Sequence, residues 1–440
     1  MTFDENLLIL PIGKIQFLMM SVTKCIQETC IKRINFLKNI MEYFMKNEKT
    51  KEIIYIGDVG KPNTALSIHA QNMARLFGNL GYHTTFICDD YEGMNKISDE
   101  TDLFNYCYTS KFITIPKISA IEWLIDELTG WKYRKILKEK IKNKKPEFIL
   151  MYGYSGESWM VKYCHKKKIP FLVERVDWFE KSDRTGFIER ELIQRQVDKT
   201  ILKIDKNVDG VISISKFFKE YYYKMKVPTI FIPPIFEFGN SAILEKYKRS
   251  SMLHLVYAGS IGGNKDYILP VLQAVKHINS KKLHIHMDLI GVTLEQVENV
   301  TGEVCWQKYG IDIHGRVSNS IAKKIIQKAD FSFLLRENKQ YAKAGFSTKF
   351  AESMCLGVPV ICTKVGGADS VITHMYDGIC LDNNDILTIE KTLIILMNKS
   401  SEEIIEMKNN AYITASRLFN IDSYTQEMSG FLNKLKELYE

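Results

Sequence analysis

Short apolar runs alternate with amphipathic stretches along the chain from about residue 52 onward. Residues 52–56 form an apolar run typical of a buried strand, and residues 84–88 form another. Between them, apolar side chains recur at helical spacing at Leu66, Ala70, Met73, Leu76, Phe77 and Leu80. Gly81 follows this stretch and is suited to end a helix. The pattern therefore predicts a βαβ opening.

The same alternation continues to the end of the chain. Further strands are expected over 148–152, 171–173, 210–214, 230–232, 253–257, 284–290, 310–314, 331–335 and 358–362. Helices are expected over 65–80, 159–168, 187–206, 216–224, 267–279, 321–328 and 424–439. Strands that alternate with helices favour parallel sheets, so the fold class is α/β.

The chain is expected to form two parallel-sheet domains that face each other across a cleft. The predicted divisions are an extension over 1–50, a first domain over 51–235, a linker over 236–250, a second domain over 251–420 and a final helix over 421–440 that packs back on the first domain. Ligands of such folds lie beyond the carboxyl ends of the strands.

Composition and charge are those of a globular protein with a modest basic excess. Among 440 residues, 60 lysines and arginines face 52 acids, and 45% of positions are hydrophobic. The excess gathers before residue 52 and over 132–145. The pattern over residues 21–47 predicts a basic amphipathic helix. Such a helix could contact an anionic membrane surface, could be a structured extension, or could lie upstream of a natural start near Met41 or Met45. Zinc-finger and RNP-like motifs are missing from the sequence, so nucleic acid is not an expected partner.

Cysteine usage and the amino-terminal pattern indicate a cytoplasmic protein. The nine cysteines are scattered without a CxxC pair, and most lie in apolar runs. Residues 7–20 are apolar, but they include Pro11 and Lys14 and are too short to span a bilayer. We therefore expect a cytoplasmic location, with peripheral contact to the inner face of the membrane as an added expectation.

The segment over 336–359 carries the strongest chemical signal. It runs from a strand end through a loop into a short helix, whose first N–H groups and dipole suit a phosphate. Lys349 and Glu352 stand three residues apart, so one could meet an anion while the other accepts hydroxyl hydrogen bonds. A sugar nucleotide offers both groups. The alternative is an ordinary cap with a solvated ion pair, although neither Ser347 nor Thr348 is followed three residues later by the Glu or Gln that a capping box needs.

Other loops at strand ends could join this site. Residues 259–265 form a glycine-rich loop that ends in Lys265, and Arg336 follows a strand directly, although it could pair instead with Glu337 or Asp330. Gly366 and Gly367 suit either a close backbone approach or a turn into a helix over 370–376.

In the first half, residues 57–61 form the matching loop, with Asp58 as a substrate contact or a plain polar loop residue. Glu174 and Asp177 lie beside Trp178, an arrangement that suits sugar hydroxyls or acid–base work. A surface network centred on Arg175 is the alternative.

A metal site is not expected. His284 and His286 share one face of a strand, but no third ligand is evident from the sequence, and the chain has no D-x-D pair.

Several motifs together resemble glycosyltransferase family 4, whose members have the GT-B fold of two Rossmann-like domains. The resemblance covers roughly residues 52–440. It is carried by AGFSTKFAESMCLGVPVI over 344–361, YAGSIGGNKD over 257–266, the stretch over 311–335, ERVDWFE over 174–180 and DGVISISKFFKEYY over 209–222.

The resemblance implies a retaining, metal-independent transfer from a UDP- or GDP-sugar to an acceptor hydroxyl. It implies diphosphate contacts for Lys265, Arg336 and Lys349, and a ribose contact for Glu352. Further donor contacts would come from Gly259, Gly262, Gly263, Arg316, Gly345, Phe346, Ser347, Thr348, Gly366 and Gly367. The acceptor would meet Gly57, Asp58, Gly60, Lys61, Glu174, Asp177 and Trp178. The chain departs from the family pattern at Ala344, where a glutamate is usual, and at Ser260, where an arginine is frequent.

The expected function is therefore a glycosyltransferase without a cofactor, acting on a saccharide or lipid-linked saccharide in surface polysaccharide or lipid-linked saccharide synthesis. The departures at Ala344 and Ser260 motivate an alternative, a catalytically idle protein of the same fold that binds a glycan or a partner glycosyltransferase. A sugar-nucleotide epimerase would need acidic and histidine groups around the sugar, and the sequence shows no such cluster in the right place.

Overall fold

The computed structural model describes residues 51–57, 59, 64–89, 102–109, 125, 128–184, 186–187, 189–238, 250–259, 266–303 and 305–440. Residues 52–440 belong to one compact unit. The expected basic extension over 1–50 lies outside the described residues, as do Asp58, Gly60, Lys61, Gly262, Gly263 and Lys265.

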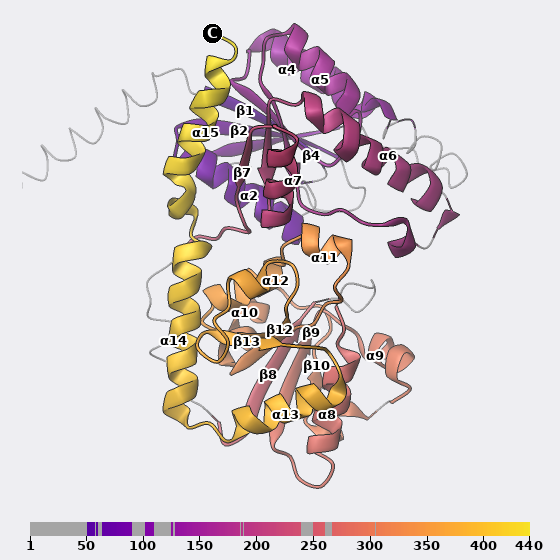
Figure 1. The fold of residues 1–440 in the computed structure, drawn as a ribbon, viewed down its shortest axis with the longest axis vertical. Coiled ribbons are helices and arrows are strands. Elements are labelled where there is room, and N and C mark those ends of the chain that lie inside the picture. Colours follow the sequence, from indigo (N-terminus) through magenta and orange to yellow (C-terminus); the bar gives the residue numbers. More distant parts are fainter. Residues whose placement is uncertain are drawn as a thin grey trace, which may run out of the picture. The chain divides into compact units, whose positions relative to one another are not determined.

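The first sheet has seven parallel strands in the order β3-β2-β1-β4-β5-β6-β7 (Figure 1). They are β1 (Lys51–Ile56), β2 (Tyr82–Cys88), β3 (Phe104–Tyr108), β4 (Phe148–Tyr152), β5 (Phe171–Arg175), β6 (Gly210–Ser213) and β7 (Thr229–Phe231). The associated helices are α2 (Ala65–Gly78), α4 (Trp131–Asn143), α5 (Glu157–Lys166), α6 (Gln194–Lys199) and α7 (Lys216–Lys224). The strands expected from the sequence include neither β3, an edge strand whose polar and aromatic residues alternate, nor the edge strand of the second sheet at Gly378–Leu381.

The second sheet has six parallel strands in the order β10-β9-β8-β11-β12-β13. They are β8 (Leu253–Ala258), β9 (Ile285–Ile290), β10 (Ile311–Ile313), β11 (Phe331–Leu334), β12 (Val360–Thr363) and β13 (Gly378–Leu381). Its helices are α8 (Leu269–Ile278), α9 (Leu294–Thr301), α10 (Asn319–Lys328), α11 (Gln340–Ala344), α12 (Thr348–Cys355), α13 (Ile386–Met397) and α14 (Ser401–Leu418). The predicted α/β class with two Rossmann-like parallel sheets is therefore confirmed.

One local prediction was right in position but not in helix type, and another was wrong. Residues 187–206 were expected to form one helix, and the chain is helical throughout 189–207, but π-helical turns flank α6 and a 3-10 turn at Asp205–Asn207 ends the stretch. The helix expected over 370–376 is replaced by a 3-10 turn at Ala368–Ser370 and irregular chain. Met375 in this stretch has a φ of +63°, which a right-handed helix does not allow.

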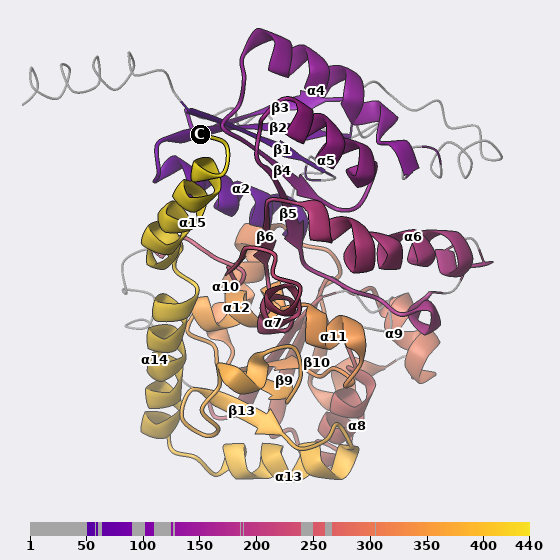
Figure 2. The ribbon, with the colours of Figure 1, turned by 45° about the horizontal axis from the view of Figure 1, so that its top comes forward.

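The last two helices connect the two sheets. Ala411 and Ala415 of α14 pack with α12 of the second half. Met428, Leu432 and Leu435 of α15 (Thr425–Glu437) pack in the core of the first sheet, and Figures 1 and 2 show both helices in yellow along one side. None of the helices in the described part of the chain combines the length and apolar character needed to cross a bilayer.

Strand order places the functional residues. In each sheet the first three strands in sequence extend to one side of the first strand, and the later strands lie on its other side. The strand order therefore reverses between β1 and β4 and between β8 and β11. A crevice forms where connections leave adjacent parallel strands in opposite directions, and ligands of such sheets bind there. The loops after β4, β8 and β11 are therefore the first places to search for a site.

Candidate active site

A cleft of about 610 Å³ lies between the carboxyl ends of the two sheets. Residues of both halves border it, from the ends of β4, β5 and β6 on one side and from the end of β11 and the start of α12 on the other. Its polar lining includes His69, Tyr152, Asp177, Asp266, Arg336 and Lys349. The cleft therefore coincides with the switch points of both sheets.

The start of α12 opens onto this cleft. Ser347 is the N-cap residue, and its hydroxyl accepts a hydrogen bond from the Phe350 backbone N–H at 3.4 Å. Ser347, Thr348 and Lys349 all border the cleft. The first N–H groups of a helix have no acceptor within the helix, so this end of α12 presents donors and a positive dipole end to a ligand.

Lys349 and Arg336 meet at one carboxylate that the sequence reading did not select. Lys349 Nζ lies 2.6 Å from Oδ2 of Asp266, and Arg336 Nε lies 3.0 Å from Oδ1. Burial alone would raise the pKa of Asp266, but the charges of Lys349 and Arg336 outweigh it and hold that pKa below its usual range. The group therefore carries two positive charges and one negative charge at neutral pH. Asp266 ends the YAGSIGGNKD motif, so its proximity to a predicted phosphate loop was the available signal.

Glu352 stands one helical turn beyond Lys349 and does not border the main cleft. Lys349 and Glu352 share only a narrow space of about 10 Å³, while Glu352 also borders a cavity of about 240 Å³ with Lys323. Burial raises the pKa of Glu352, and the Lys323 charge opposes that rise. Among the described residues its carboxylate has no hydrogen-bond partner. It is therefore a half-buried acceptor without a donor in the part of the chain that the structure describes.

The glycines predicted for donor contacts lie where the backbone comes close to other groups. A Cβ on Gly259 would stand 2.1 Å from Lys349 Nζ, and one on Gly345 would stand 3.0 Å from Asp177 Oδ1 across the cleft. Gly366 and Gly367 have φ values of +68° and +80°. Close contacts and left-handed backbone both favour glycine at these sites.

Arg316 and Ala344 lie away from the cleft, whereas Phe346 borders it. Phe346 borders the cleft but packs edge-on against Phe350 and Phe419. Arg316 is exposed and does not border the cleft. Ala344 is buried against the core of the first half, and its carbonyl accepts a hydrogen bond from Ser215 Oγ at 2.5 Å.

The acceptor-side residues are split between the cleft and the core. Asp177 borders the cleft. Trp178 is buried, stacks on Phe218 with ring centroids 6.3 Å apart, and donates its indole N–H to Asp198 at 3.0 Å. Its position therefore does not support the expected acceptor contact. Gly57 lies at the end of β1, where a Cβ would stand 2.6 Å from the Tyr152 carbonyl oxygen.

Glu174 acts behind the cleft rather than in it. It is buried, accepts a hydrogen bond from the Tyr55 hydroxyl, and contacts His69 Nε2 at 2.5 Å. His69 borders the cleft, and its other ring nitrogen, Nδ1, is buried without a hydrogen-bond partner among the described residues. The Glu174 carboxylate therefore holds the His69 ring in position from behind the cleft. The sequence reading missed His69, although it lies three residues after Leu66 on the buried face of the predicted helix.

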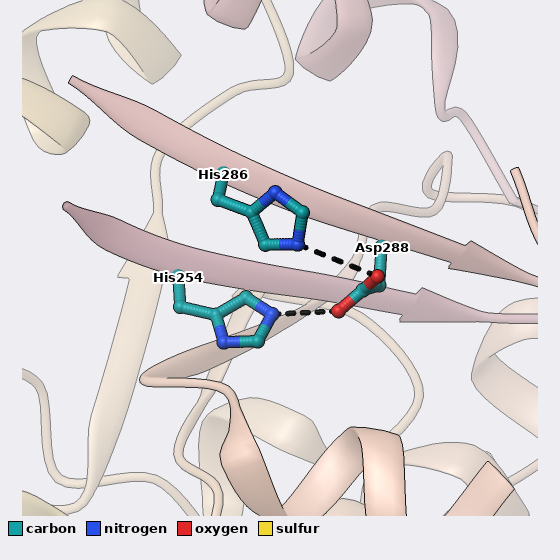
Figure 3. A group of neighbouring side chains, drawn as sticks. All are labelled: His254, His286 and Asp288. Carbon is teal, nitrogen blue, oxygen red and sulfur yellow. Dashed lines mark hydrogen bonds and ion pairs between the residues drawn. The ribbon is translucent and has the colours of Figure 1, made fainter. Parts of the chain in front are cut away.

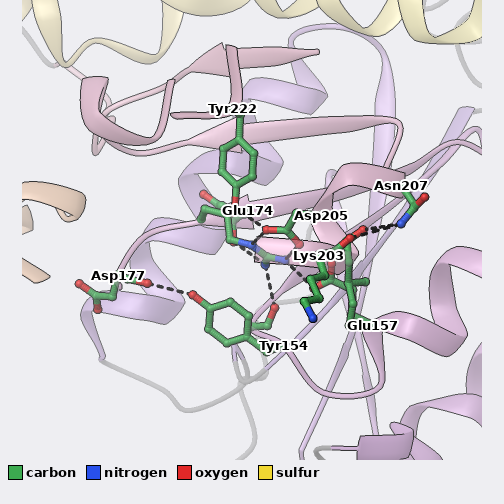
Figure 4. A network of polar contacts seen from close by, with 11 residues as sticks. Tyr154, Glu157, Glu174, Asp177, Lys203, Asp205, Asn207 and Tyr222 are labelled. Carbon is green, nitrogen blue, oxygen red and sulfur yellow. Dashed lines mark hydrogen bonds and ion pairs between the residues drawn. The ribbon is translucent and has the colours of Figure 1, made fainter. Parts of the chain in front are cut away.

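The network around Arg175 is buried, contrary to the surface network considered from the sequence (Figure 4). Its guanidinium donates to both carboxylate oxygens of Asp205, at 2.8 and 2.6 Å, and to Glu157 at 2.5 Å. The Tyr222 hydroxyl also donates to Asp205. Burial raises the pKa of Glu157, whereas for Asp205 the Arg175 charge outweighs the effect of burial and lowers the pKa. The network anchors the end of β5, from which the chain enters the cleft.

Comparison with known proteins agrees with this geometry. Residues 246–414 match the family model of glycosyl transferases group 1. This match includes β8–β13, α12 and the cluster of Asp266, Arg336 and Lys349. An uncharacterized glycosyltransferase of Methanocaldococcus jannaschii is 27% identical over 218 residues, which are 46% of this chain and 53% of that protein. The match thus spans about half the length of the relative.

Similarity to solved structures extends over most of the chain. Sucrose-phosphate synthase of Thermosynechococcus elongatus has a TM-score of 0.68 at 14% identity, covering 88% of this chain and 100% of that one. Anabaena HepE in complex with UDP-glucose has a TM-score of 0.59 at 10% identity, covering 87% and 99%. At such identities the similarity shows the fold, which is the GT-B fold of glycosyltransferases.

Proposed function

We propose that this protein is a retaining glycosyltransferase of family 4, which transfers a sugar from a nucleotide diphosphate donor to an acceptor hydroxyl. The observation that carries the proposal is the convergence of Lys349, Arg336 and the start of α12 on one side of the cleft. Two cations and a helix N-terminus suit a diphosphate, and the match to glycosyl transferases group 1 covers all three.

In this proposal the donor lies along α12. Its diphosphate takes the place of Asp266 as a partner of Lys349 and Arg336, and its ribose hydroxyls donate to the Glu352 carboxylate one turn away. HepE has been solved with UDP-glucose, which supports a nucleotide sugar as the ligand class. As the glycosidic bond breaks, negative charge grows on the leaving diphosphate, and the preorganised cations stabilise it. The residues need no metal for this role.

The acceptor would enter from the first half. Asp177 and His69 border the cleft opposite the cations, and Glu174 holds the His69 ring. In a retaining transfer the acceptor hydroxyl attacks the face from which the diphosphate leaves, and a donor phosphate oxygen helps to take its proton. We propose a saccharide or lipid-linked saccharide acceptor, as used in surface polysaccharide synthesis, with the basic stretches favouring an anionic membrane surface.

A screen of nucleotides tests the proposal. Nucleoside diphosphates and nucleotide sugars are added to the full-length protein, and its thermal midpoint is measured. A ligand at a hundred times its dissociation constant stabilises the fold by about 2.7 kcal/mol. Absence of a shift with every nucleotide would contradict the donor site. Each nucleotide sugar that raises the thermal midpoint is then incubated with candidate acceptors. The nucleoside diphosphate that is released measures hydrolysis or transfer.

The second candidate function is a catalytically idle protein of the same fold. It is favoured by Ala344, whose side chain is buried in the core of the first half, and by Asp266, which already neutralises part of the basic charge. Nucleotide binding without release of diphosphate from any nucleotide sugar, with or without acceptors, would support it.

A further inference from the structure

Three histidines converge on one aspartate in the second sheet, away from the cleft. His254 lies near the start of β8, and His286 is its register partner on β9. Asp288 follows two residues after His286, so both side chains lie on one face of the sheet. His314 comes directly after β10, the edge strand beside β9. None of the four residues borders the cleft described above.

The ring nitrogens point at the carboxylate from three strands. His254 Nε2 lies 2.6 Å from Asp288 Oδ2, and His286 Nε2 lies 3.5 Å from Oδ1. Dashed lines mark both contacts in Figure 3. His314 Nε2 lies 2.5 Å from Oδ1. The chain has nine histidines, so a third of them gather at one acid. One cationic partner would balance the charge of the Asp288 carboxylate, so three imidazoles are more than charge balance requires.

The donor set matches the preferences of a transition-metal ion. Ligand atoms of His254, His286 and Asp288 all lie within 4.8 Å of one another. A tetrahedral zinc ion with bonds of about 2.1 Å holds its ligand atoms about 3.4 Å apart, so small side-chain rotations suffice. Imidazole nitrogens with one carboxylate oxygen suit Zn²⁺ better than Ca²⁺ or Mg²⁺, which prefer oxygen ligands.

Burial and surroundings fit a metal site that remains open to solvent on one side. Asp288 is buried, His254 and His286 are partly buried, and His314 is exposed. Metal can therefore enter from the His314 side. The Asp312 carboxylate lies 4.0 Å from His286 Nε2 and adds negative charge nearby.

We propose that His254, His286, Asp288 and His314 bind one Zn²⁺ or a similar transition-metal ion that joins β8, β9 and the edge strand β10. The site is structural, because it is built on the sheet and not on the cleft where the nucleotide is proposed to bind. It stabilises the edge of the sheet and leaves the donor residues unchanged. The proposal does not depend on the proposed transferase activity.

Titration with Zn²⁺ tests the proposal directly. Full-length protein without a histidine tag is treated with chelator, dialysed, and titrated with ZnCl₂ by calorimetry, with the thermal midpoint and bound metal measured in parallel. We expect one ion per chain, micromolar or tighter affinity, and a higher midpoint. Co²⁺ should give the visible absorption of a tetrahedral site.

Matched variants decide which residues bind the ion. His314→Ala changes an exposed side chain and should weaken Zn²⁺ binding at least 10- to 100-fold, as should His286→Ala. His277→Ala is the control, because His277 is an exposed histidine paired with Glu390 on other elements and should retain full affinity. Circular dichroism verifies that each variant is folded. Absence of stoichiometric binding in the wild type, or equal affinity in His286→Ala, His314→Ala and His277→Ala, would overturn the proposal.

Discussion

Removal of the Lys349 charge is the sharpest test of the proposed donor site. Lys349→Ala deletes one of the two cations that flank Asp266 and leaves the cap of α12 intact, since Ser347 provides that cap. We expect weaker binding of a nucleoside diphosphate and unchanged binding of the corresponding nucleoside, which lacks the phosphates.

The magnitude follows from the geometry. Two unit charges about 4 Å apart interact by about 4 kcal/mol at an effective dielectric constant of about 20. The Lys349 side chain is 33% exposed, and Asp266 competes for it at 2.6 Å, so solvent screening and that competition reduce the gain. A loss of about 2 kcal/mol remains, which corresponds to roughly 30-fold in the dissociation constant.

Isothermal titration calorimetry at two salt concentrations measures this loss. Both the diphosphate affinity and the effect of Lys349→Ala should shrink at high salt, because salt screens partly exposed charges. Lys391→Ala, an exposed lysine on α13, is the matched control and should bind like the wild type. Equal diphosphate affinity in Lys349→Ala and the wild type would refute the phosphate role, and an equal loss of nucleoside binding would point to a change in folding instead.

Three further predictions concern the same site, and one concerns stability. Asp266→Asn should strengthen diphosphate binding several-fold, because it removes an anion that competes for two cations; weaker binding in calorimetry would show that the carboxylate positions the cations instead. Gly259→Ala should weaken diphosphate binding as Lys349→Ala does, with no added loss in the double variant, because its Cβ would stand 2.1 Å from Lys349 Nζ; additive losses would argue for separate effects. Nucleoside affinity should fall as pH drops through the raised pKa of Glu352, since protonation removes the negative charge that strengthens its hydrogen bonds from the ribose, and Glu352→Gln should abolish this dependence; a pH profile shared by both proteins would contradict the ribose contact. Burial lowers the pKa of Lys408 from 10.5 to about 7, so between these pH values the folded chain binds fewer protons than the unfolded chain. The free energy of unfolding should therefore rise with pH over this range. Urea titrations should show a smaller rise in Lys408→Met.

Local patterns account for most of the fold. Strand and helix positions follow from runs of apolar residues with periods of 2 and 3.6, and their alternation predicts parallel sheets. These signals do not report the type of helix. Residues 189–207 are helical as expected, but π-helical turns flank α6, and the closing 3-10 turn begins at the buried Asp205, which the Arg175 guanidinium holds in place.

The donor site was partly predictable, because local sequence patterns also position some of its residues. Lys349 and Arg336 are positioned by a strand end and a helix start, both of which are local features. Their pairing with Asp266 was not predicted, because Asp266 lies 70 positions before Arg336 and 83 positions before Lys349 in the sequence. Side chains so far apart in the sequence meet only after the sheet has formed. The hydrogen bond between His69 and Glu174 depends in the same way on α2 packing over β5.

The sequence by itself therefore determined most of the strands and helices, that the sheets are parallel, and which charged residues stand at the carboxyl ends of strands. Tertiary structure alone decided the partners. It buried Trp178 and Arg175, placed Glu352 away from the main cleft, and set His254 beside His286 and Asp288. The physical reason is that periodicity within a segment reports which face of an element is buried, whereas the register between strands and the packing of helices on a sheet are set by contacts between distant segments.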